Sequence, residues 1–202
     1  MNLLIDSLPE AVSIDGAEYA IRSDFRTGIR FELLIQDDEK PEAEKLLESL
    51  LLFYPEIPDD IHGAVDRMLW FYRGGKEDED QKAEEAKEEA PDSDLKADYS
   101  FKHDAAYIYA AFLEAYGIDL TKTELHWWTF RALFLGLPEE CAFQKIRGYR
   151  SVKISSKMSK EQKEFYRKMK RLFALPISKK EQAAHDRITE ALMNGGDLSG
   201  IL

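Results

Sequence analysis

Of all parts of the sequence, residues 76–98 place the strongest limit on how this chain can fold. It carries 11 acidic and 4 basic residues, no aromatic residue, and a single large aliphatic side chain, Leu95. Such a segment cannot bury enough apolar surface to offset the entropy lost on ordering. Gly74 and Gly75 precede it and Pro91 interrupts it, and both residue types end regular structure. We therefore expect a disordered or exposed acidic linker here, with an acidic interaction tail as the alternative.

On either side of this linker the chain has enough apolar residues to form a hydrophobic core. It has 202 residues, of which 44% are hydrophobic, a size that suits one medium domain or two small ones. We expect an N-terminal region over residues 1–75, with a β-hairpin and helices, and a helical C-terminal region over residues 99–202.

Charge is distributed very unevenly along the sequence. The chain has 39 acidic and 28 basic residues, for a net charge of −11. Residues 1–75 carry 16 acids and 7 bases, whereas residues 145–180 carry 13 bases and 2 acids. Since complementary charges steer association, this distribution predicts docking between charged surfaces. It also allows head-to-tail self-association, with the acidic half of one copy on the basic half of another.

Composition also predicts where the protein acts. One cysteine, Cys141, excludes a disulfide framework and is typical of a reducing compartment. The chain has no run of about 18 apolar residues, the length needed to span a membrane. Its N-terminus lacks the basic start and apolar stretch of a signal peptide. We expect a soluble, intracellular protein without a membrane partner.

The pattern of turns and apolar spacing predicts a mainly α protein with a small N-terminal β-hairpin. Asp15-Gly16 separates two short segments of alternating polarity, and Asp-Gly favours the positive φ angles of a tight hairpin turn. The rest shows helical spacing and helix-end signals. Expected helix starts are marked by Asp24, Pro41, Asp59 or Asp60, Ser100, Thr121, Pro138, Ser159 and Ser178. Three of these have the spacing of a capping box: Thr121 with Glu124, Ser159 with Gln162, and Ser178 with Glu181.

The residues that carry chemistry form no recognisable catalytic arrangement in the sequence. There is no glycine-rich phosphate-binding loop and no Gly-x-Ser-x-Gly nucleophile motif. The four histidines are scattered: His62, His103, His126 and His185. None has a second histidine at metal-ligand spacing, so a surface or helix-capping role is the better interpretation. We expect a protein that is not an enzyme and that has no cofactor and no metal site.

The basic segment 145–180 is the strongest candidate binding site. Its aromatic residues are Tyr149, Phe165, Tyr166 and Phe173. Bases interleaved with aromatic rings are typical of nucleic-acid grooves, so a nucleic-acid-binding helical module is one interpretation, although nucleic acid is the less favoured partner. The helical spacing of Phe165, Met169 and Leu172 is more simply that of a core face. We favour a docking surface for an acidic protein. Its predicted charged contacts are Lys163, Arg167, Lys170 and Arg171.

Aromatic residues are concentrated in the span 107–149. Trp127 and Trp128 are adjacent there, and neighbours on a helix point about 100° apart. One interpretation is that one of them anchors the core and the other lies at an edge or an interface, where Trp is enriched. The favoured interpretation is that two packed helices share an aromatic core. Trp127, Trp128 and Tyr149 are the predicted aromatic contacts of a partner.

A more specific pattern runs through the same region. It comprises YSFKHDAAYIYAAF at 99–112, YGIDL at 116–120, HWW at 126–128, GLP at 136–138, RGYR at 147–150 and, nearer the N-terminus, DFR at 24–26. This pattern resembles the gene-product-15 family of tailed bacteriophages. The likeness covers roughly residues 1–73 and 99–175, and it is most specific over 99–150.

The resemblance implies a role in phage tail morphogenesis. In genome position, the family is similar to tail assembly chaperones, whose genes lie between those of the tail-tube and tape-measure proteins. Such chaperones coat the helical tape-measure protein until the tube polymerises around it. The resemblance thus implies a chaperone in the cytoplasm of the bacterial host, absent from the mature virion, with the tape-measure protein as its partner and the tail-tube protein as a second one. It implies no catalytic residue.

Overall fold

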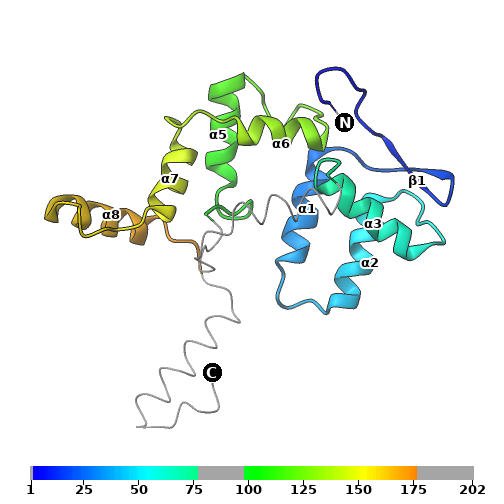
Figure 1. Ribbon diagram of the computed structural model, residues 1–202, viewed down its shortest axis with the longest axis horizontal. Helices are drawn as coiled ribbons and strands as arrows, with labels where there is room; N and C mark the ends of the chain where they lie inside the picture. Colours follow the sequence, from blue (N-terminus) through cyan, green and yellow to red (C-terminus); the bar gives the residue numbers. More distant parts are fainter. Residues whose placement is uncertain (1, 77–97, 177–202) are drawn as a thin grey trace, which may run out of the picture.

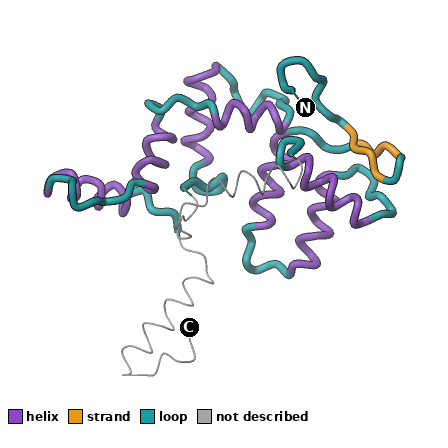
Figure 2. Tube along the Cα trace, in the orientation of Figure 1, coloured by secondary structure: helices purple, strands orange, loops and turns teal. Residues whose placement is uncertain are grey.

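The structure, a computed structural model, describes residues 2–76 and 98–176. Within these ranges it has seven α-helices and one two-stranded antiparallel sheet (Figure 2). This confirms the predicted mainly α fold with a small N-terminal hairpin. Apart from Lys76 and Asp98, the predicted linker lies outside the described residues, and so does the helix predicted to begin at Ser178.

The hairpin forms where the Asp-Gly pair predicts it. Strand β1 (Ala11–Ile14) pairs antiparallel with β2 (Ala17–Ala20). Asp15 and Gly16 have φ angles of 48° and 80°, and two positive values in succession are what a two-residue type I′ turn requires. Val12 and Ile14 are buried while their neighbours on β1 are exposed. One face of the hairpin therefore belongs to the core.

Three helices follow the hairpin: α1 (Phe25–Ile35), α2 (Glu42–Phe53) and α3 (Ile61–Tyr72). Asp24 and Asp60 cap α1 and α3 as predicted, because their carboxylates accept hydrogen bonds from the backbone N–H groups of Arg26 and Gly63. Pro41, the predicted first helical residue, stands at the N-cap of α2, so this helix begins one residue later than predicted. Local capping chemistry thus accounts for these starts.

The second described range contains α5 (Ala105–Tyr116), α6 (Trp127–Leu135), α7 (Ala142–Ser151) and α8 (Lys160–Leu172). The predicted starts at Ser100 and Thr121 are wrong. Ser100 lies in a turn, where its backbone N–H donates to the Asp104 carboxylate (2.9 Å), and α5 begins after that aspartate. Thr121 donates its hydroxyl to Asp119 (2.6 Å) in another turn. Helix α7 likewise begins after a turn that follows Pro138.

A single hydrophobic core joins the two predicted regions. The Phe25 ring of α1 stacks on Phe130 of α6, with 4.9 Å between ring centroids, and Tyr72 stacks on Trp127 at 5.4 Å. The backbone N–H of Trp127 also donates to the carbonyl oxygen of Ser23 (2.7 Å). Figure 1 shows α1 and α6 in contact at the centre of the molecule. The acidic linker therefore separates the two regions in sequence, but the two regions share one core.

Helix α8 stands apart from this core. In Figure 1 it lies at one end of the molecule, and the hairpin lies at the other. Its main packing partner is α7, and α7 in turn packs on α5. No helix in the described ranges is both long enough and apolar enough to cross a bilayer.

Candidate functional site

Helix α8 carries all four charged residues predicted to contact a partner. The Ser159 hydroxyl accepts a hydrogen bond from the backbone N–H of Gln162 (3.2 Å), and the Gln162 side chain accepts one from the backbone N–H of Ser159 (2.9 Å). This is the predicted capping box. Lys170 and Arg171 occupy the last turn, where positive charge is favourable beside the unpaired carbonyl groups. These end signals explain why so charged a segment is helical.

Three of the predicted contact bases lie opposite the apolar side chains of α8. Lys163, Arg167 and Lys170 follow one another at intervals of four and three residues and share one face. Phe165 and Leu172 lie on the other, and 47% and 65% of their surfaces are exposed. No residue of α8 is buried. The interpretation of this apolar face as core is therefore wrong, because the described part of the chain places only one edge of it against α7.

Tyr149 of α7 provides most of that edge contact. Its ring stacks on Phe173, 5.9 Å between centroids, and meets Phe165 edge-on at 6.0 Å. Tyr149 is half-buried as a result. The structure thus brings Tyr149 together with the predicted bases of α8, and it places this aromatic residue beneath the helix rather than on the outer surface.

A buried ion pair, which the sequence did not reveal, fixes α7 and the end of α8. Asp104 is 1% exposed, and its carboxylate accepts two hydrogen bonds from the Arg150 guanidinium (2.7 and 2.8 Å). The same guanidinium donates to the carbonyl oxygens of Phe173 (2.6 Å) and Asp98 (3.0 Å). Asp104 and Arg150 both lie within the motifs that carry the family resemblance. Their place in these motifs was the one sign in the sequence that the two residues matter. Arg150 therefore links three segments at the base of α8.

Trp127 and Trp128 are both buried, each with 3% of its surface exposed. The interpretation that one of them lies at an edge is therefore wrong, and the favoured one, an aromatic core shared by packed helices, is confirmed. The indole N–H of Trp127 donates to the carbonyl oxygen of Tyr72 (2.8 Å), and that of Trp128 to the carbonyl oxygen of Phe71 (2.6 Å). The carbonyl oxygen of Phe71 also accepts from the backbone N–H of Gly74 (3.0 Å), and that of Tyr72 accepts from the Arg131 guanidinium (2.8 Å), so the two indoles add hydrogen bonds at this helix end. Neither ring presents surface to a partner in this structure.

His126 caps α6, which fits the capping role expected for a histidine. Its Nδ1 accepts a hydrogen bond from the backbone N–H of Trp128 (3.1 Å), and its Nε2 lies 3.0 Å from the carbonyl oxygen of Pro9. Burial lowers the pKa of His126. A neutral ring with its proton on Nε2 satisfies both contacts at once. The residue thus joins the start of α6 to the N-terminal segment.

A second polar cluster lies between the two halves of the core. The Tyr72 hydroxyl donates to the Glu32 carboxylate (2.8 Å). Burial raises the pKa of Glu32, and the hydrogen bond from Tyr72 only partly offsets this effect. Burial also raises the pKa of Tyr99 to about 12. A carboxyl group with a raised pKa can act as an acid, but here it faces Tyr72 inside the protein.

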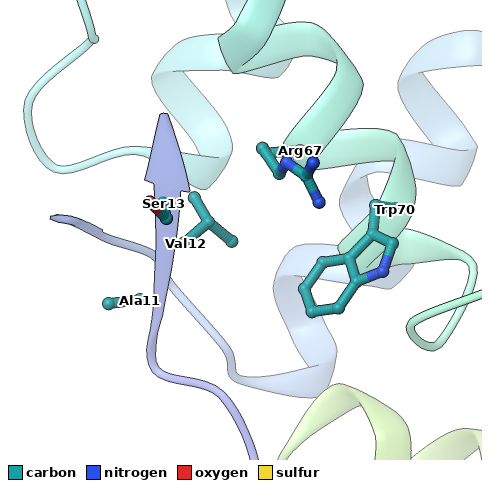
Figure 3. A pocket seen from close by; sticks show the side chains of 5 residues that line it. All are labelled: Ala11, Val12, Ser13, Arg67 and Trp70. Atoms are coloured by element: carbon teal, nitrogen blue, oxygen red, sulfur yellow. The ribbon is translucent and has the colours of Figure 1, made fainter. Parts of the chain in front are cut away.

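One hollow opens between β1 and α3 (Figure 3). Its lining residues are Ala11, Val12, Ser13, Arg67 and Trp70. The Arg67 guanidinium lies 5.9 Å from the centroid of the Trp70 ring. Arg67 is the one ionisable side chain of this lining, which therefore has no acid–base pair. Within the described ranges, no three His, Cys, Asp or Glu side chains gather as metal ligands.

The described residues thus form a helical protein with a closed aromatic core and a peripheral helix, α8, whose bases and apolar side chains face outward. This arrangement suits the docking of a macromolecular partner. The family model described as Bacteriophage Gp15 protein matches residues 4–175. The chain therefore belongs to this bacteriophage family, as the sequence resemblance predicted, and α8 lies within the matched range. No curated relative and no solved structure matches the chain.

Proposed function

We propose that this protein is a tail assembly chaperone that binds the tape-measure protein of its phage through α8. It would act during assembly in the host cytoplasm, with the tail-tube protein as a second partner, and it would be absent from the mature virion. Membership of the Gp15 family supports a phage role. A non-enzymatic binding role is part of the same proposal.

The observation that carries this proposal is the outward-facing surface of α8. A tape-measure protein is a long helical chain with apolar stripes, and such stripes dock on apolar faces of other helices. Phe165 and Leu172 supply an apolar edge, and the described chain leaves 47% and 65% of their surfaces exposed. The helix that carries this edge also carries Lys163, Arg167, Lys170 and Arg171, and its positive charge favours an acidic helical segment as the partner.

The nucleic-acid interpretation of the same segment has less support. Single-stranded nucleic acid binds to aromatic rings whose faces are open for stacking. Tyr149 and Phe173 stack on each other, and Phe165 packs edge-on against both Tyr149 and Tyr166. The rings that would serve as stacking platforms are therefore engaged with one another. Binding of random DNA at low salt would favour this alternative over the chaperone.

Co-expression with the tape-measure protein from the same phage genome tests the proposal. We expect the chaperone to raise the soluble fraction of that protein severalfold and to co-purify with it. The triple variant Arg167→Gln, Lys170→Gln, Arg171→Gln should weaken binding about tenfold, since each exposed charge contact is worth about 0.5 kcal/mol. The measurements are the soluble fraction after centrifugation and the amount retained by a tag on the chaperone.

A matched variant controls for the loss of three positive charges. Arg30, Lys102 and Lys122 are exposed bases outside the segment 145–180, and replacing them with Gln should leave binding unchanged. If wild-type protein neither solubilises nor retains the tape-measure protein, the proposal is wrong. If both triple variants bind equally well, α8 is not the docking surface.

A further inference from the structure

Within the described ranges, helix α2 presents a second exposed apolar face, on the far side of α5, α6 and α7 from α8 (Figure 1). Ala43, Leu47 and Leu51 follow one another at intervals of four residues and form one stripe, about 12 Å long at 1.5 Å per residue. Leu47 and Leu51 are each 54% exposed. Buried Ser49, Leu50 and Phe53 hold the other side of the helix against the core. The stripe therefore faces away from the protein.

The charge beside this leucine stripe is negative. Glu44 and Glu48 stand one residue beyond Ala43 and Leu47 and run alongside them. Lys40 is the basic residue that faces them, with its ammonium group 4.0 Å from Glu44 and 2.5 Å from Glu48. Over residues 37–48 the sequence has six acids and two lysines, a net charge of −4. One lysine thus offsets only part of the local negative charge.

The exposed edge of α8 has the same form with the opposite charge. Lys168 lies between Phe165 and Leu172 on the helix surface, three residues after the first and four before the second, and Arg171 lies one turn further along. Glu161 and Glu164 are the acids of this helix. Residues 157–173 carry seven bases and these two acids, a net charge of +5.

The two faces cannot meet within one chain. Helix α2 packs on α1 and α3, whereas α8 packs on α7. Figure 1 shows α5, α6 and α7 between α8 and the N-terminal helices, and the rigid aromatic core holds this separation. A contact between the faces therefore requires two molecules.

We propose that α8 of one copy docks on the leucine stripe of α2 of a second copy. Of the three pairings that these faces allow, α2 on α2 joins charges of −4 and α8 on α8 joins charges of +5, so only α2 on α8 is attractive. Such a contact is heterologous, because the copy that contributes α8 keeps its α2 unused and the copy that contributes α2 keeps its α8 unused, and it leads to open chains. The self-association does not depend on the proposed binding of the tape-measure protein.

Sedimentation of the purified full-length chain, with no tape-measure protein present, tests this proposal. One pair of helix faces is a small interface, so we expect association on the order of 10–100 μM. The weight-average mass should rise with concentration beyond twice the 23.3 kDa of the monomer in about 50 mM salt and fall back towards 23.3 kDa in about 500 mM salt, because salt screens exposed charges. A mass that stays at the monomer value at 100 μM, or that stops at a closed dimer, overturns the proposal.

A charge-swap pair identifies the interface. Glu44→Lys with Glu48→Lys brings the net charge of residues 37–48 from −4 to 0 in one chain, and Lys168→Glu with Arg171→Glu brings that of residues 157–173 from +5 to +1 in another. Each variant alone should remain monomeric, whereas an equimolar mixture should associate, because the unchanged α8 of the first docks on the unchanged α2 of the second. If the variants associate as well as the wild type does, the proposed faces are wrong.

An apolar variant with a matched control completes the test. Leu47→Gln on α2 should shift association to severalfold higher concentration, whereas Leu113→Gln, at a 45% exposed leucine on α5, should leave it unchanged. Both positions are on the surface, so far-UV circular dichroism should match the wild type. Equal effects of the two substitutions would contradict a specific role for the leucine stripe.

Discussion

Gly28 lies within α1, where alanine would ordinarily be favoured by about 1 kcal/mol because glycine loses more backbone entropy on folding. Here a Cβ atom would overlap the six-membered ring of Trp127. Glycine therefore allows α1 and α6 to approach closely enough for the indole of Trp127 to reach α3. The same ring donates to the carbonyl oxygen of Tyr72, so the backbone at position 28 and the end of α3 are coupled through one side chain.

Gly28→Ala should destabilise the protein by about 1–3 kcal/mol, the usual range for an added methyl group in a filled core. Gly148→Ala in α7 is the matched control, because no atom lies within 4 Å of a Cβ at that position. It should stabilise by about 0.5–1 kcal/mol. Urea denaturation of the two variants measures both effects. Stabilisation by both substitutions would show that Trp127 does not occupy the space beside Gly28.

Glu32 makes a pH-dependent contribution to stability. Burial raises its pKa above the ordinary value of 4.5, so the folded protein binds this proton more tightly than the unfolded chain does. The resulting stability is complete below pH 4.5 and is lost as the pH rises through the folded pKa. Above that pKa the buried carboxylate carries a charge that burial disfavours.

Glu32→Gln should therefore gain stability relative to the wild type as the pH rises from 4.5, and the amide oxygen can still accept the hydrogen bond from Tyr72. Urea denaturation of both proteins between about pH 4.5 and 8 gives the difference in unfolding free energy. Glu114→Gln, at an exposed glutamate of α5, controls for the loss of one carboxylate. A difference for Glu32→Gln that is constant over this range would contradict the assigned pKa shift.

At the scale of the element, the attachment of α8 depends on Arg150. Its guanidinium pairs with buried Asp104 and donates to the carbonyl oxygen of Phe173, one residue after α8 ends. Removing one partner of a buried ion pair leaves the other charged and without its counter-ion. The N-terminus of α5, the body of α7 and the end of α8 should therefore loosen together.

Arg150→Met should destabilise the protein by about 3–5 kcal/mol and reduce the hydrogen-exchange protection of α8. Arg147→Met is the control, because its pair with Asp98 is partly exposed (23% and 31%) and such pairs are worth about 1 kcal/mol or less. Urea denaturation and amide exchange by mass spectrometry measure the two effects. Equal losses from both substitutions would show that the Asp104 pair does not anchor α8.

The helix ends show which elements could be predicted from the sequence. Asp24, Asp60 and Ser159 accept hydrogen bonds from residues two or three positions away, so local spacing was enough to place these starts. Thr121 has the same spacing relative to Glu124, but its hydroxyl bonds to Asp119 instead. A hydroxyl group can cap a helix, as in Ser159, or bond to a side chain within a turn, as in Thr121. Sequence spacing alone does not distinguish these two roles, because the tertiary structure decides whether a helix begins at the residue.

Contacts between distant residues explain the errors at the candidate site. The burial of Trp128 depends on the carbonyl oxygen of Phe71, 57 residues earlier, and that of Asp104 depends on Arg150, 46 residues later. No local pattern contains these pairs. On α8 the sequence correctly predicted the helix and its capping box. Its apolar face was misread as core, because periodicity shows that a face is apolar but not what covers it.

At the scale of the whole molecule, residues 2–76 and 98–176 are parts of one folded body. Phe25 and Phe130 stack across the boundary, the backbone at Ser23 bonds to that at Trp127, and the Arg26 side chain donates to the carbonyl oxygen of Leu120 (2.6 Å). We therefore expect the two parts to assemble into this core even when the acidic segment does not connect them covalently. The oppositely charged helices α2 and α8 are therefore attached to the same folded core.

Fragments 1–76 and 98–202, expressed together as separate chains, should assemble, co-purify through a tag on one of them, and unfold in a single transition. Phe25→Ala in the first fragment should prevent recovery of the second, because truncating a buried Phe costs about 3–5 kcal/mol. Leu113→Gln in the second fragment, at an exposed site, should have no effect. Separate purification of the two wild-type fragments would contradict a shared core.

The chain has three tryptophans, and all three lie in one cluster at the junction of α3 and α6: Trp70 and Trp128 meet at 5.5 Å, and Trp127 stacks on Tyr72. Intrinsic tryptophan emission is therefore an optical probe of this junction alone, whereas circular dichroism registers every helix. If α8 detaches before the core opens, the dichroism signal will fall at a lower urea concentration than the emission changes. The separation between the two midpoints would report the attachment of α8 without any added label.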